Sequence, residues 1–277
     1  MLGERQQAAA AELAQWWDGI RRGGVGSHTV LLAGPAGWGR STVLDQLPHL
    51  FRAAGGPVGL EVRVHGKSLP AGPGAQAAAV RDSLLGADIR RQAAALLCRS
   101  RLRPSRRLGT DRLLPAGIAG TISLLLASLA AAGAGSVPDD DPAGQNGAAA
   151  RAARIVAAVS VSVPTLVIID DADEMGPDLA VTVIENLMDG DDSKLLVAAA
   201  ADPGSDVAAA LFARARYGPT AGRVHRARAD PRMGSQSRAE LAGELRPHLT
   251  EAQVQELARQ TRTFAEIFAA VRPDALS

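Results

Sequence analysis

One glycine-rich stretch, GPAGWGRST at Gly34–Thr42, constrains this chain more than any other. It matches the pattern G-x-x-x-x-G-K-[ST], except that arginine stands at the lysine position. The apolar run His28–Ala33 precedes it and predicts a strand, and the residues from Ser41 to Pro48 predict a helix. Its glycines allow backbone turns that bring N–H groups around phosphate oxygens, and the positive end of the helix dipole points to the same place. The stretch therefore predicts a phosphate-binding loop between a strand and a helix.

Two side chains of this loop have specific expected roles. Arg40 would lie against the β- and γ-phosphates of a bound nucleotide, and Ser41 would bind Mg²⁺. The other residues would shape the loop and present its backbone N–H groups. The candidate nucleotide-binding residues are Gly34, Pro35, Ala36, Gly37, Trp38, Gly39, Arg40, Ser41 and Thr42.

A second candidate element is a strand that ends in two acids. Val163–Ile169 is a largely apolar run, as expected for a strand buried on both faces of a parallel sheet, and Asp170 and Asp171 follow it. A carboxylate at the carboxyl end of such a strand points into the crevice where open α/β sheets bind ligands. We expect Asp170 to hold Mg²⁺ through water and Asp171 to orient or deprotonate the attacking water. We interpret Asp173 and Glu174 as solvated loop acids, with Glu174 as the reserve candidate for the base.

Strand-like and helix-like runs alternate along the rest of the chain. Further strands are predicted at Pro57–Val64 and Leu195–Ala200. Helices are predicted at Ala75–Leu102, Gly147–Ser160 and Asp178–Met188. This alternation predicts an α/β fold in which a parallel sheet lies between layers of helices.

The C-terminal part has a different pattern. Three capping boxes follow one another, at Ser237–Glu240, Thr250–Gln253 and Thr263–Glu266, and each opens an amphipathic stretch. They predict three short helices. We therefore divide the chain into an α/β core at residues 1–230 and a small helical unit at residues 235–277.

The two motifs together resemble those of a known family. GPAGWGRST and LVIIDDAD resemble the Walker A and Walker B elements of AAA+/STAND ATPases, and Gly3–Gln7 is similar to the segment that precedes the loop in many of them. The resemblance extends from about Gly3 to Val271. It implies a P-loop NTPase fold of the ASCE type, a sheet ordered 5-1-4-3-2 with the strand at 194–202 between the two Walker strands, and a C-terminal helical lid. It also implies ATP and Mg²⁺ as ligands.

Three departures from the family pattern bear on catalysis. Arg40 replaces the lysine, Ala201 and Asp202 stand where a polar or arginine sensor is expected, and no arginine finger stands out among Arg214, Arg216 and Arg262. Arg40 and Asp171 remain the catalytic candidates, but ATP binding is better supported than turnover.

Two functional hypotheses stay open. The leading hypothesis is a regulatory nucleotide switch that hydrolyses ATP slowly. The alternative is a nucleotide-binding scaffold that does not hydrolyse ATP and docks a protein partner or a membrane. A third hypothesis is a kinase that acts on a small molecule, but the sequence shows no signature of an acceptor pocket.

Composition narrows the cellular setting. A single cysteine fits a reducing compartment, and the polar, alanine-rich opening at Met1–Gln15 does not resemble a secretory signal, so we expect a cytoplasmic protein. The formal charge of +1 and the single tyrosine give no support to nucleic-acid binding, which we regard as unlikely.

An apolar insert at Leu113–Val137 contains no charged residue and is long enough to be tested as a membrane span of about 20 residues. A single span would place the phosphate loop and Asp170 on opposite sides of a bilayer, although both must reach one Mg²⁺. We therefore interpret the insert as a buried or partner-facing helix, with membrane contact as the less favoured reading. A protein partner or self-association is the corresponding expectation.

Overall fold

The computed structural model describes a part of the chain that includes most of the predicted core. The described residues are 4–22, 26–34, 37, 39–53, 58–102, 142–189, 192–217, 222–228, 238–239, 242–243, 249–261 and 266–267. The apolar insert at 113–137 lies outside them.

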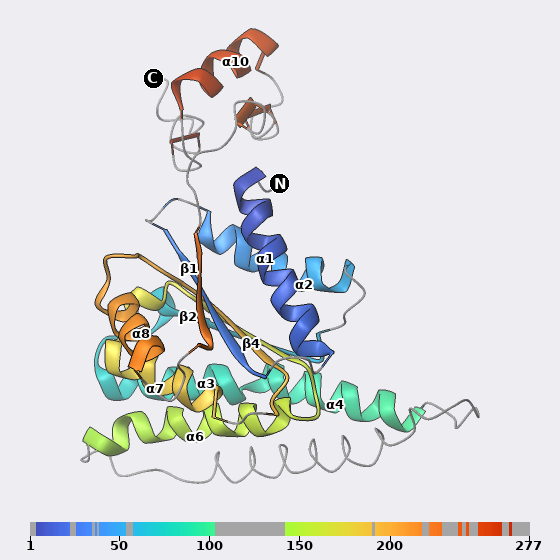
Figure 1. Ribbon diagram of the computed structural model, residues 1–277, viewed down its shortest axis with the longest axis vertical. Helices are drawn as coiled ribbons and strands as arrows, with labels where there is room; N and C mark the ends of the chain where they lie inside the picture. Colours follow the sequence, from blue (N-terminus) through green and yellow to red (C-terminus); the bar gives the residue numbers. More distant parts are fainter. Residues whose placement is uncertain are drawn as a thin grey trace.

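Helices and strands alternate along this part of the chain (Figure 1). The strands are β1 (His28–Ala33), β2 (Leu60–His65), β3 (Thr165–Asp170), β4 (Leu195–Ala201) and β5 (Val224–Arg228). The α-helices are α1 (Glu4–Arg21), α2 (Arg40–Ala53), α3 (Pro73–Leu85), α4 (Ala87–Leu102), α6 (Pro142–Ser160), α7 (Pro177–Leu187), α8 (Asp206–Tyr217) and α10 (Glu251–Gln260). Two short 3₁₀ turns, η1 (Gly66–Ser68) and η2 (Ala172–Glu174), follow β2 and β3.

The five strands form one parallel sheet. Their order is β2-β3-β4-β1-β5, so β4 lies between β1, which leads into the phosphate loop, and β3, which ends in the acids. This is the predicted 5-1-4-3-2 order, and the predicted α/β fold with a parallel sheet between helices is confirmed. Because the strands are parallel, their carboxyl ends meet at one edge of the sheet, and the loops that follow β1, β2 and β3 come together there.

Alternate residues of the strands supply two separate cores. Val167 and Ile169 of β3 pack into a core with α3, α6 and α7, whereas Leu166 and Ile168 pack into a core with α1 and α2 on the other face. In Figure 1, α1 and α2 cover one side of the sheet and the remaining core helices cover the other. Burial on both faces explains why β1, β3 and β4 are nearly continuous apolar runs.

The fifth strand was not predicted from its residues. β5 has the sequence VHRAR, and its Ala227 is buried in the core of α1 and α2. Among the described strands it lies at the edge of the sheet, with β1 as its one neighbour. An edge strand with polar side chains carries little of the apolar pattern that identifies a central strand.

Three helix boundaries differ from the predictions. The single helix expected over Ala75–Leu102 is two helices, because Gly86 takes an extended conformation between α3 and α4. Helix α2 continues past Pro48, whose ring is buried among core residues, so tertiary packing outweighs the lost backbone hydrogen bond. Helix α6 begins at Pro142, before the predicted start at Gly147, and proline suits the first turn of a helix because its fixed φ is already helical.

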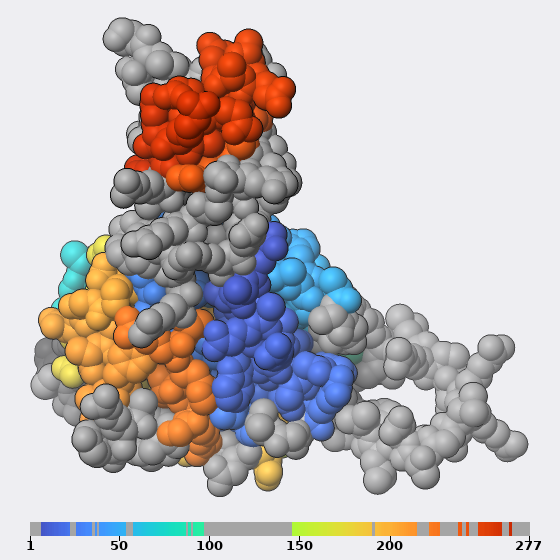
Figure 2. Space-filling view, turned by 45° about the horizontal axis from the view of Figure 1, so that its top comes forward, coloured from blue at the N-terminus to red at the C-terminus, as the bar shows by residue number. Residues whose placement is uncertain are grey.

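The predicted capping box at Thr250 is present. The Thr250 hydroxyl accepts from the Gln253 N–H, the Gln253 side chain accepts from the Thr250 N–H, and α10 starts there. The other two capping boxes lie at least partly outside the described residues. Helix α10 lies beyond one end of the sheet (Figure 1), where its atoms form a projecting knob in the space-filling view of Figure 2.

Among the described residues, no helix has both the length and the apolar character needed to cross a bilayer.

Two histidines lie side by side near the amino ends of β1 and β5. His28 Nδ1 and His225 Nε2 are 2.9 Å apart, and the Trp16 ring stacks on His225 with centroids 4.0 Å apart. Burial, with the nearby charges of His225 and Arg223, lowers the pKa of His28 to about 4 from its usual 6.5. The pair is therefore held neutral in the folded chain at neutral pH.

Acidification should destabilise the chain through His28. The unfolded chain binds a proton at this residue below pH 6.5, whereas the folded chain binds it only near pH 4. The free energy of unfolding therefore falls as the pH drops from 6.5 to about 4. We expect a loss of about 1 to 2 kcal/mol after allowance for solvent screening at the sheet edge. Urea denaturation across this pH range should show a shallower pH slope for His28→Gln, and an unchanged slope for His49→Gln, which removes an exposed histidine of α2. A slope for His28→Gln equal to that of the wild type would contradict the prediction.

Candidate functional site

The phosphate loop begins at the carboxyl end of β1. The Gly34 N–H donates to the Ala201 carbonyl at 3.3 Å, which ties the start of the loop to the end of β4. Gly37 and Gly39 have φ values of 82° and 75°, in the region that residues with a Cβ rarely adopt. The Gly39 carbonyl accepts from the Val43 N–H at 3.0 Å and so starts α2. Pro35, Ala36 and Trp38 lie outside the described residues.

The acidic turn, residues Asp170–Glu174, lies at the carboxyl end of β3. Asp170 is the last residue of the strand, and its Oδ1 accepts from the Asp171 N–H at 3.0 Å. Asp171 has φ 49° and ψ 49°, the one left-handed non-glycine conformation among the described residues. Aspartate tolerates this conformation better than most residues, and such outliers concentrate at functional sites. Both aspartates are 9% exposed.

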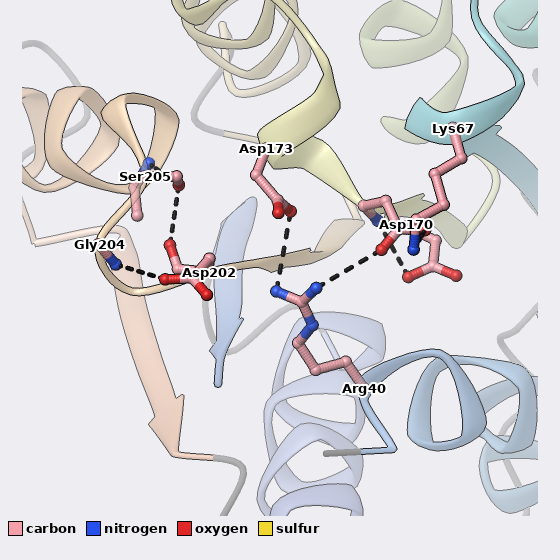
Figure 3. A network of polar contacts seen from close by, with 9 residues as sticks. Arg40, Lys67, Asp170, Asp173, Asp202, Gly204 and Ser205 are labelled. Atoms are coloured by element: carbon pink, nitrogen blue, oxygen red, sulfur yellow. Dashed lines mark hydrogen bonds and ion pairs between the residues drawn. The ribbon is translucent and has the colours of Figure 1, made fainter. Parts of the chain in front are cut away.

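Arg40 joins the phosphate-loop helix to the acidic turn (Figure 3). Its Nη2 lies 3.5 Å from Asp171 Oδ1, and its Nη1 lies 3.7 Å from Asp173 Oδ1. The arginine is only 5% exposed. Arg40 Nη1 and Asp173 Oδ1 are buried, and neither has a hydrogen-bond partner in the described part of the chain. The guanidinium therefore bridges two carboxylates while keeping hydrogen-bonding capacity for a further acceptor.

A second cation reaches the acidic turn from the other side, as Figure 3 shows. Lys67 Nζ, on η1, lies 2.9 Å from Asp171 Oδ2. This hydrogen bond is the main reason that the pKa of Lys67 is raised. The Lys67 side chain is 65% exposed, in contrast to Arg40. Both oxygens of the Asp171 carboxylate are thus paired with cations.

The backbone holds η1 tightly against the acidic turn. His65, at the end of β2, is in register with Asp170 of β3. Gly66 is buried so close to the turn that a Cβ on it would lie 1.9 Å from the Asp171 carbonyl oxygen. Only glycine fits this approach, so the position of Lys67 beside Asp171 follows from the packing of the two turns.

The structure brings together Arg40, Asp170 and Asp171, all three of which are buried, while Ser41 is exposed on the first turn of α2. Two further residues of this cluster were missed. The sequence pattern predicts Asp173 to be a solvated loop acid, but in the structure its Oδ1 lies 3.7 Å from Arg40 Nη1. Lys67 had two sequence signals: it is one of only two lysines in the chain, and it stands shortly after the predicted strand Pro57–Val64.

Other candidates have different surroundings. The Asp202 side chain accepts from the Gly204 N–H at 2.8 Å and so stabilises the turn after β4. Arg214 is ion-paired with Glu185 at 3.7 Å. The side chain of Arg216, and Arg262, lie outside the described part of the structure. The Glu174 side chain is exposed, and its carbonyl accepts from the Gln76 amide at 3.5 Å.

The residues present fit a nucleotide with a divalent cation. A magnesium ion prefers carboxylate and hydroxyl oxygens, which Asp170 and Ser41 provide. Phosphate oxygens need cations and free N–H groups, which Arg40 and the first turn of α2 provide. Arg40 Nη1 is buried and has no hydrogen bond among the described residues. A buried donor without an acceptor costs free energy, and a phosphate oxygen would supply that acceptor.

Comparison with known proteins identifies the family. A model of the AAA ATPase domain matches residues 5–209, and no curated protein matches the chain. Among solved structures the chain is similar to Drosophila ORC bound to DNA, with 13% identity and a TM-score of 0.47 over 98% of this chain and 55% of that one. It is also similar to the FIGL-1 AAA domain in complex with ADP, with 14% identity and a TM-score of 0.43 over 94% of this chain and 66% of that one.

A third similar structure is the Aeropyrum pernix ORC2 protein in ADPNP–ADP complexes, with 14% identity and a TM-score of 0.45 over 98% of this chain and 61% of that one. The chain spans 55% to 66% of the length of these three neighbours. The family model covers well over half of the 277 residues and includes both the phosphate loop and the acidic turn. This chain therefore belongs to the AAA ATPase domain family, as a nucleotide-binding P-loop module.

Proposed function

We propose that this module is a regulatory switch that binds ATP with Mg²⁺ between the phosphate loop and the acidic turn and hydrolyses it slowly. The observation that carries the proposal is the buried Arg40 guanidinium, which spans from α2 to two carboxylates of the acidic turn. This cation belongs to the phosphate-loop helix and contacts the acidic turn, so it links the two halves of the site. Its partners must rearrange when phosphate oxygens enter, and this couples nucleotide occupancy to the conformation of the turn.

The proposed roles follow from the positions of the groups. Arg40 and backbone N–H groups within Gly37–Thr42 would hold phosphate oxygens, since the Gly34 N–H already donates to the Ala201 carbonyl. Ser41 and Asp170 would hold Mg²⁺, which neutralises phosphate charge when bound. Asp171 would orient the attacking water. The acidic turn is also tied to α3, since the Gln76 side chain contacts both Glu174 and Gly176, so a shift of the turn would reach that helix.

Slow hydrolysis is proposed because Asp171 is engaged. Arg40 lies on one of its oxygens and Lys67 on the other. Asp171 can orient a water molecule only after at least one of these ion pairs is broken, and breaking it costs free energy. The same engagement also supports the alternative, a nucleotide-binding scaffold without turnover that docks a protein partner or a membrane through residues 113–137. Phosphate release at saturating ATP separates the two, because a scaffold should show none above the Asp171→Asn variant.

Calorimetric titration tests the binding site itself. We expect the chain to bind ATP more tightly with Mg²⁺ than without it, and Asp170→Ala to remove most of that difference. Loss of a carboxylate that orients metal-bound water typically lowers metal affinity by about 10-fold or more. A wild-type chain that fails to bind ATP would refute the proposed function. An Asp170→Ala variant with unchanged affinity in both conditions would show that this acid is not near the metal.

A further inference from the structure

We propose that Lys67 is a nucleotide-contacting residue of this site: its ammonium exchanges the Asp171 carboxylate for phosphate oxygens when ATP binds. This inference rests on the proposed nucleotide-binding function. The phosphate loop has a guanidinium at Arg40, where the usual motif has the compact ammonium of a lysine. Under this proposal, Lys67 on the turn after β2 supplies that ammonium. The geometry points to this residue through three observations, which concern its partner, its backbone and its freedom to move.

The first observation is the shared partner. Lys67 Nζ and Arg40 Nη2 lie 2.9 Å and 3.5 Å from the two oxygens of one carboxylate, that of Asp171. In Figure 3, Lys67 comes from above and Arg40 from below, and both point into the space beside Asp170. The two cations repel each other, and the Asp171 carboxylate between them offsets this repulsion. A polyphosphate at this place would offer both cations a second set of anionic oxygens.

The second observation is the fixed backbone. η1 cannot retreat from the acidic turn without breaking the close contact of Gly66 with the Asp171 carbonyl. The parallel pairing of β2 with β3 sets the same distance, through the register of His65 with Asp170. The Cα of Lys67 is therefore held at the edge of the site, and only its side chain needs to move to change partners.

The third observation separates the two cations. Arg40 is 5% exposed and bridges Asp171 and Asp173, so moving it would leave buried charges unpaired. The Lys67 side chain is 65% exposed, and Asp171 is its one ion-pair partner among the described residues. Its four-carbon stem is flexible, and water solvates the ammonium during the exchange. Lys67 is thus the cation that can change partners at low cost.

The composition of the chain makes a direct test practical. Lys67 and Lys194 are its only lysines, and Lys194 lies just before the amino end of β4, at the opposite edge of the sheet. Labelling of the intact chain with an amine-reactive ester, followed by peptide mass spectrometry, reports on both residues in one sample. A non-hydrolysable ATP analogue with Mg²⁺ should slow the labelling of Lys67 severalfold, ADP should slow it less, and neither should affect Lys194.

Affinity measurements supply an independent readout. Lys67→Ala should weaken binding of the ATP analogue by about 10-fold and of ADP by less, because a charge-assisted contact to the terminal phosphate is lost. Lys67→Arg should restore part of the difference, and Lys194→Ala should behave like the wild type. If Lys67 served only as the counter-ion of Asp171, nucleotide would leave its labelling unchanged or increase it.

The outcomes distinguish this inference from the proposed function. A wild-type chain that binds neither nucleotide would overturn the function and the inference together. A wild-type chain that binds ATP, with unprotected Lys67 and an unchanged ATP-to-ADP preference in Lys67→Ala, would overturn the inference alone. If Lys67→Ala does not fold, labelling of the wild-type chain still decides.

Discussion

Arg40→Ala is expected to weaken nucleotide binding by about 30-fold or more, whereas Arg40→Lys is expected to keep binding and raise turnover. Removing a buried charge-assisted phosphate contact typically costs about 2 kcal/mol, and here it also leaves Asp171 and Asp173 without their shared cation. Lysine keeps the charge as a compact ammonium but lacks the broad, planar guanidinium that reaches both carboxylates. It should therefore loosen the hold on Asp171. Titration calorimetry and steady-state phosphate release measure the two effects.

A matched control comes from the same helix. Arg52 lies in the last turn of α2 with its side chain 58% exposed, and Arg52→Ala should leave nucleotide affinity unchanged. Circular dichroism of each variant checks that loss of binding is not loss of folding. Nucleotide binding by a folded Arg40→Ala chain at the wild-type level would mean that Gly34–Thr42 is not the phosphate site. An Arg40→Lys variant that binds but shows no phosphate release would favour the scaffold reading.

Asp171→Asn is expected to lower any ATP turnover by about 10²-fold or more while leaving affinity for Mg·ATP nearly intact. Asparagine has the same shape and tolerates the left-handed backbone of this position, so the turn should keep its conformation. What disappears is the negative charge that orients water. Lys67 remains solvated and Arg40 retains Asp173, so the phosphate contacts should survive.

The control for this variant is Asp178→Asn, which makes the same charge change at an exposed aspartate in the first turn of α7. It should keep wild-type turnover. Measurements of single-turnover rate and of affinity on both variants separate chemistry from binding. If Asp171→Asn lost affinity with no separate defect in turnover, Asp171 would be a binding residue and not the group that orients water.

Much of the fold could be predicted locally. The central strands β1, β3 and β4 are apolar because both faces of the sheet are covered, and that burial leaves a direct trace in the sequence. The capping box at Thr250 is equally local, since both hydrogen bonds join residues three apart. Edge strand β5 left no such trace, and Pro48 was accommodated by core packing that no short window reveals.

The order of the motifs along the chain is enough to predict that Arg40, Asp170 and Asp171 lie at one edge of the sheet, because each motif follows the carboxyl end of a parallel strand. The pairing of the charges depends on long-range contacts. Arg40 meets Asp171 across 131 residues of chain, and Lys67 reaches the other oxygen of the same carboxylate. Those contacts depend on the order β2-β3-β4-β1-β5 and on the close approach of Gly66 to the acidic turn, which are products of long-range packing and not of local spacing.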